Sequence, residues 1–69
     1  MNLYEKDVLL VKRTTLLDKL HPATNQLKAA QKMADMGILP KDHERIAALT
    51  QECEYLTAEL ADVEKHLQE

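Results

Sequence analysis

Three side chains in this 69-residue sequence have types that could perform chemistry: Cys53 as a nucleophile, and His43 and His66 as acid–base groups. The third histidine, His21, is distant in sequence, so the histidines lack the short spacing of a zinc site, and a single cysteine excludes an internal disulfide. Cys53 falls on an apolar repeat, His66 on the flank of that repeat and His43 in the first turn of the predicted second helix, which favours a small buried side chain and two solvated imidazoles over catalytic groups. With one glycine in the chain, a Gly-rich phosphate-binding loop is also lacking. We therefore expect no enzyme, no cofactor and no metal ion.

The elements that must position these side chains are helices. The sequence is 45% apolar and 30% charged, rich in Ala, Leu, Lys, Glu and Gln, and its only aromatic residues are two tyrosines. Good helix formers dominate, and the β-branched and aromatic residues typical of strands are scarce, so we predict an all-α fold. At this length the chain forms one small domain, residues 1–69, with a core that is marginal unless a disulfide, a metal or a partner assists. We expect that assistance to come from a protein partner.

Charge is divided unevenly between the two halves of the chain. Residues 1–36 carry six basic and four acidic side chains, a net +2, whereas residues 37–69 carry three basic and eight acidic ones, a net −5. An acidic total of −3 without a continuous basic face argues against nucleic acid as the main partner. The N-terminus has mixed charge, and its apolar run, residues 8–11, is far below the ~20 residues of a membrane span. We expect a cytoplasmic protein that binds neither nucleic acid nor membrane.

A turn signal lies near the middle of the chain. Gly37 is suited to the left-handed position that ends a helix, with Met33 and Ile38 at the flanking positions of a Schellman motif, and Pro40 is suited to the first position of a new helix. A link this short makes neighbouring helices antiparallel. We therefore predict a coiled-coil-like antiparallel helical hairpin, with arm one over about 3–36, a turn at 37–39 and arm two over about 40–68.

The apolar spacing of arm two predicts the contact between the arms. Its apolar residues recur with alternating steps of three and four, which is a heptad seam: Ile46, Leu49, Cys53, Leu56, Leu60, Val63 and Leu67. If the chain turns at residue 38, facing residues have numbers that sum to about 76, which gives these partners on arm one: Ala30, Leu27, Ala23, Leu20, Leu16, Arg13 and Leu9. Six of the seven are apolar, and we expect the exception, Arg13, to reach Asp62 or Glu59 at the edge.

Two further signals concern the course of arm one. Asn2 followed by Glu5 resembles a capping box and places the start of the helix at Leu3. Pro22 removes one backbone hydrogen bond and disfavours helical geometry at His21. We therefore expect a kink or a break at Pro22, and the continued phase of the seam favours the kink.

Arm one carries more apolar side chains than the seam requires. We predict that the surplus binds a partner, because burial of each such side chain contributes ~1.5–3 kcal/mol. The predicted partner-binding residues are Leu3, Tyr4, Val8, Leu10, Val11 and Leu17. Alternatively, Leu10 and Leu17 broaden the internal seam. A weaker candidate is the tip cluster of Met33, Met36, Ile38 and Leu39, which local turn packing also explains.

The Leu/Ala-rich first arm, the Met-Gly-Ile-Leu-Pro turn at 36–40 and the acidic second arm together resemble one known family. Over about residues 16–67 the chain is similar to the small E-component co-chaperones of type III secretion needles, the YscE and PscE type. The resemblance implies binding to a TPR-like chaperone, the G-component. The pair would hold the needle subunit in the cytosol and prevent its premature polymerisation. It implies no catalytic residues.

Two other interpretations remain open from the sequence. One is a homodimeric four-helix bundle in which the apolar surplus of two copies packs together, since two-fold symmetry makes such a patch self-complementary. The other is a small phage or plasmid regulator, either an RNA-binding hairpin dimer or an inhibitor of a host enzyme.

Overall fold

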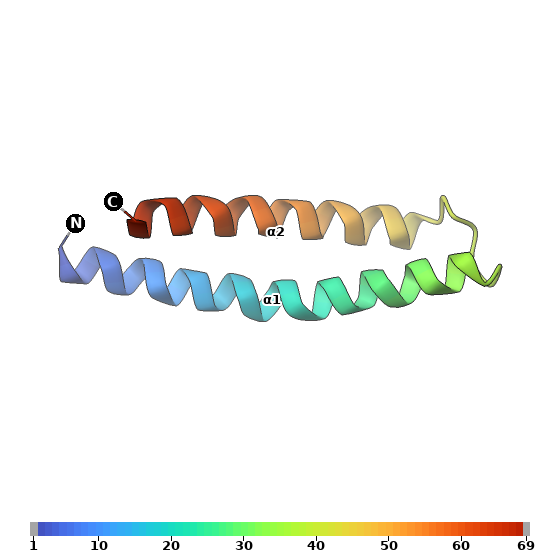
Figure 1. Ribbon diagram of the computed structural model, residues 1–69, viewed down its shortest axis with the longest axis horizontal. Coiled ribbons are helices and arrows are strands. Elements are labelled where there is room, and N and C mark those ends of the chain that lie inside the picture. Colours follow the sequence, from blue (N-terminus) through green and yellow to red (C-terminus); the bar gives the residue numbers. More distant parts are fainter. Residues whose placement is uncertain (1, 69) are drawn as a thin grey trace.

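Two helices run antiparallel and pack along their length (Figure 1). The computed structural model describes residues 2–68, so Met1 and Glu69, the ends of the predicted domain, lie outside the described residues. Helix α1 spans Leu3–Asp35, helix α2 spans Glu44–Gln68, and residues 2–68 contain no strand. Together the helices form a rod of 52 × 15 × 15 Å. The prediction of an all-α helical hairpin is confirmed.

Both ends of α1 follow the sequence signals. The Glu5 backbone N–H donates to Asn2 Oδ1 at 2.8 Å, so Asn2 caps the helix and Leu3 is its first residue. At the other end Gly37 adopts a positive φ of 78°, and the Ile38 N–H donates to the carbonyl of Met33 at 2.9 Å. That bond defines the Schellman motif, and glycine is needed because the left-handed conformation is costly for residues with a Cβ.

Helix α2 begins at Glu44, four residues later than the predicted start at Pro40. The carbonyl of Pro40 accepts a hydrogen bond from the His43 N–H at 3.1 Å, which closes a turn. The Arg45 N–H then donates to His43 Nδ1 at 3.1 Å, so the imidazole caps the start of α2. A helix that began at Pro40 would have Leu39 as its capping residue, and a leucine side chain has no hydrogen-bond acceptor. The connection is longer than predicted, and His43 precedes the helix instead of lying in its first turn.

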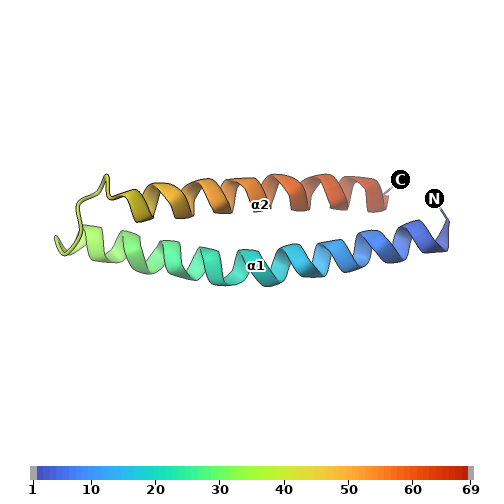
Figure 2. The same ribbon diagram turned by 180° about the vertical axis from the view of Figure 1, so that it is seen from behind.

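Helix α1 continues through Pro22 without a break. Figure 1 shows a gentle bow with its concave side toward α2, and Figure 2 shows the same bow from behind. Pro22 is exposed, whereas Ala23 beside it is buried against α2. Apolar packing on both sides of Pro22 holds the helix in phase, and the lost hydrogen bond is accommodated by curvature with the convex side toward solvent.

The heptad seam forms the core. Leu16 and Ala23 of α1 pack with Leu56 and Val63 of α2, and Val63 is only 1% exposed. Every apolar residue predicted for the seam is buried or half-buried. The full set of buried apolar side chains among residues 2–68 is small and includes three alanines: Leu16, Ala23, Ala30, Ala34, Leu49, Leu56 and Val63. The predicted seam is therefore confirmed, and the core it builds is narrow.

The cap at His43 is open to a direct test. Replacing His43 with Ala removes the acceptor for the Arg45 N–H, so we expect the free energy of unfolding to fall by about 0.5–2 kcal/mol. His43→Asp restores a side-chain acceptor at the same position and places a negative charge at the positive end of the helix. Urea denaturation followed by circular dichroism measures both variants. Equal losses in the two would show that the imidazole is not acting as a cap.

Candidate protein-binding surface

Helix α1 extends beyond the end of α2. Arg13 Nε lies 3.7 Å from Glu64 Oε1, and Leu9 and Leu67 belong to the same core cluster, so facing residues have numbers that sum to about 76. Gln68, the last residue of α2, therefore lies beside residue 8 of α1, and the first turns of α1 project past it (Figure 1). Residues 3–7 thus lie beyond the last residue of α2.

The six predicted partner-binding residues form two rows on α1. Leu3, Leu10 and Leu17 recur every seven residues and share one flank of α1, which we call the leucine row. The other three, Tyr4, Val8 and Val11, lie at spacings of three and four on the side of α1 remote from the seam, which we call the outer row. Adjacent residues of a helix differ by ~100° in direction, so a single flat partner surface cannot cover both rows.

Exposure changes steadily along the leucine row. Leu3 is 80% exposed, Leu10 is 38% exposed, and Leu17 is half-buried. Because α2 ends beside residue 8, it shields the row progressively from the N-terminus inward. Leu17 and more than half of Leu10 are thus covered, whereas Leu3 is largely exposed. The outer row is well exposed at all three positions: Tyr4, Val8 and Val11.

The two flanks of the hairpin differ in character. On one flank Lys12 Nζ lies 3.7 Å from Glu59 Oε2. A shallow hollow on the same flank is lined by Lys19, seven residues after Lys12, and by Glu52, seven residues before Glu59. The opposite flank carries the Arg13–Glu64 pair, and the leucine row runs along it. The predicted partners of Arg13, Asp62 or Glu59, are therefore wrong, because Glu59 pairs with Lys12 on the charged flank.

The inward face of the projecting turns is polar. Continuing the seam from Leu9 toward the N-terminus leads to Lys6 and Asn2, three and seven residues away. The projecting part of α1 thus does not extend the hairpin core. Its apolar side chains are Leu3 and Tyr4, which belong to the leucine row and the outer row.

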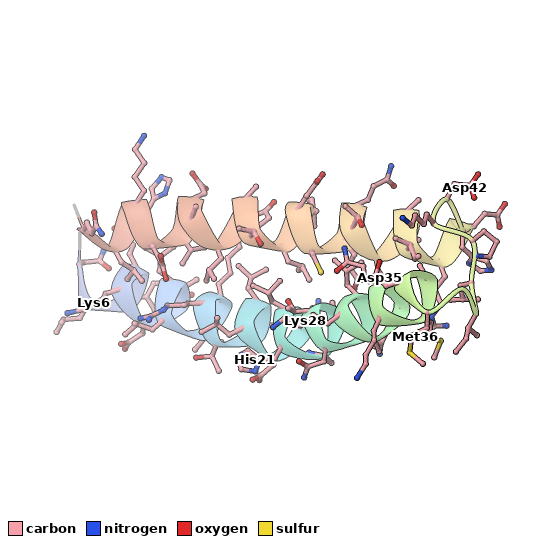
Figure 3. All side chains as sticks on the ribbon, turned by 45° about the vertical axis from the view of Figure 1, so that its right-hand side comes forward. Lys6, His21, Lys28, Asp35, Met36 and Asp42 are labelled. Atoms are coloured by element: carbon pink, nitrogen blue, oxygen red, sulfur yellow. The ribbon has the colours of Figure 1, made fainter. Side chains whose placement is uncertain are left out.

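A smaller apolar patch lies at the hairpin tip. Met33, Met36 and Ile38 are 43%, 65% and 62% exposed, while Leu39 is half-buried. Figure 3 shows Met36 at the end of the molecule opposite Lys6, so this patch is remote from the leucine row. Four residues around a tight turn offer less continuous area than the two rows of α1.

The side chains whose types could perform chemistry have structural roles in this fold. Cys53 is half-buried and packs against the core cluster, and His43 caps α2. His66 Nδ1 donates to the Asp62 carbonyl at 2.8 Å within α2. Residues 2–68 contain no group of three or more His, Cys, Asp or Glu side chains placed to hold a metal ion. Neither α1 nor α2 has the length and apolar character needed to cross a membrane.

Comparison with known proteins returned no match of any kind. The chain matches no protein-family model, no curated protein and no solved structure.

Proposed function

We propose that this chain is a small protein-binding module that acts as a co-chaperone, with the leucine row as its primary docking surface. The observation that supports this is that α1 carries two sets of apolar side chains with different surroundings. The seam residues close the hairpin, while Leu3 and Leu10 remain exposed on a flank where Arg13 and Glu64 form the ion pair. Exposed apolar side chains beside a small core can bind in a groove of a partner. Their burial there would add to the stability of the hairpin, whose own core is small.

The partner that best fits this surface is a larger helical-repeat protein. Such proteins stack helix pairs into extended concave surfaces that accept an amphipathic helix, anchored by side chains at regular spacings. The resemblance to the E-component co-chaperones favours the same kind of partner, a TPR-like chaperone. In that setting the pair would hold a type III secretion needle subunit in the cytosol and keep it from polymerising.

The proposed activity is binding rather than catalysis. Cys53 and His43 already serve the seam and the cap of α2. The hollow beside Arg13 and Glu64 and the one beside Lys19 and Glu52 are open grooves between charged side chains. Such grooves do not exclude water around a substrate in the way that an enzyme pocket does.

A charge in the leucine row tests the proposal. Leu10→Asp places a carboxylate where the partner's apolar surface should pack, and we expect its affinity for the TPR-like chaperone of the needle system to fall about 10- to 150-fold. Gln51→Asp is the matched control, since it adds the same charge to an exposed position of α2 and should bind as the unmodified chain does. Isothermal titration calorimetry measures all three affinities.

Circular dichroism on the same samples confirms that both variants remain helical. If Leu10→Asp is folded and binds as tightly as Gln51→Asp, the leucine row is not the docking surface. If the unmodified chain itself does not bind, the co-chaperone role is wrong.

A further inference from the structure

We propose that, in the absence of another partner, a second copy of this chain covers the leucine row, with the two α1 helices packed antiparallel about a two-fold axis. The result is a four-helix bundle built from two hairpins. The inference shares the docking surface of the proposed function but concerns the isolated chain. Each can therefore fail without the other.

The hairpin exposes more area than a compact monomer of the same mass would. It exposes 5345 Å². A compact monomer of 7.9 kDa exposes about 4,400 Å² by the scaling of surface with mass, so the hairpin carries an excess of about 900 Å². A stable interface of standard size buries about 800 Å² on each partner. The excess, which goes with the rod shape of 52 × 15 × 15 Å, is about what one partner of such an interface buries.

The spacing of the leucine row is self-complementary. When a helix packs antiparallel on an identical helix, the numbers of facing residues have a constant sum. In an isologous contact each such pair occurs twice, once on each side of the two-fold axis. With a sum of about 27, Leu10 faces Leu17 of the second copy, and Leu3 faces Thr24, which continues the same seven-residue spacing. Thr24 is half-buried, and its methyl group offers an apolar contact to Leu3. Each leucine of the row thus meets a leucine or a threonine in this register.

The polar side chains beside the row are compatible with this register. Asp7, Thr14 and His21 form the next row outward, also seven residues apart, and all three are exposed. Figure 3 shows His21 on the side of α1 that faces away from α2. In the antiparallel packing Asp7 comes within one residue of lying opposite His21 of the second copy, where the carboxylate can accept a hydrogen bond from the imidazole. Thr14 lies opposite Thr14 of the second copy, close to the two-fold axis.

Other ways of packing two copies are less complementary. If α1 packed on α2 of the second copy with the hairpins level, Leu3 would stay uncovered, because α2 ends beside residue 8. Leu10 would also meet the region of Glu64, which is already paired with Arg13. Packing through the opposite flank would bury the Lys12–Glu59 pair, and removing charges from water is costly.

Cysteine cross-linking tests the register. In a Cys53→Ala background, Thr14→Cys should form an intermolecular disulfide readily, because the axis brings the two thiols together and disulfides require Cα atoms about 4.4–6.8 Å apart. Val11→Cys is the matched control. Val11 is 66% exposed, so a thiol there is accessible, but a sum of about 27 places position 11 opposite position 16 of the second copy, and the two thiols do not meet. In glutathione buffer we expect the Thr14→Cys dimer to form about tenfold faster.

Sedimentation of the unmodified chain accompanies the cross-linking. A mass of two chains, together with preferential cross-linking at position 14, is the expected result. A mass of one chain up to ~100 µM, which by mass action requires a Kd well above that concentration, overturns the proposal. Cross-linking at position 11 as fast as at position 14 also overturns it, because the outer row would then lie at the contact. Both substitutions are at exposed positions, and equal helicity by circular dichroism confirms that both chains are folded.

Discussion

The hairpin depends on one apolar seam between two helices. Leu16 and Ala23 of α1 interlock with Leu56 and Val63 of α2, and no disulfide, metal or buried polar group among residues 2–68 supplements them. The ion pairs lie at the surface, where each contributes ~1 kcal/mol or less. Register is consequently set by the fit of side-chain layers, since a helix that slid along its neighbour would lose every layer at once.

The same seam determines what is left exposed. Helix α1 has 33 residues and α2 has 25, so the seam closes only part of the longer helix. Beyond the end of α2 the seam positions become polar, while apolar side chains shift to the leucine row and the outer row. A helix built only for the hairpin would lose its apolar character at that point. On α1 the apolar residues instead move to other faces, which supports a second packing role for this helix.

Most of the fold follows from short-range sequence patterns. Heptad spacing identified the seam, Asn2 the start of α1, and Gly37 its end, because each depends on a few neighbouring residues. The start of α2 was predicted too early, since an imidazole cap at His43 is uncommon and the proline signal was stronger. The ion-pair partner of Arg13 was also missed, because edge pairing depends on the rotation of both helices, which sequence spacing fixes only within about one residue. For the exposed surface, the seven-residue spacing of Leu3, Leu10 and Leu17 is visible in the sequence, but the decrease in their exposure along α1 is not, because it depends on where α2 ends.

Hydrogen exchange on the isolated chain at low micromolar concentration measures most directly whether the seam alone closes the hairpin and leaves the N-terminal turns of α1 unprotected. Amides within 9–34 of α1 and 46–67 of α2 should exchange slowly and as one cooperative unit, because opening either helix exposes the whole seam. Amides of residues 6–8, which begin the intrahelical bonding but lie beside or beyond the end of α2, should exchange far faster. Slow exchange confined to α1, or protection of residues 6–8 equal to that of the seam, would contradict a hairpin held by this contact.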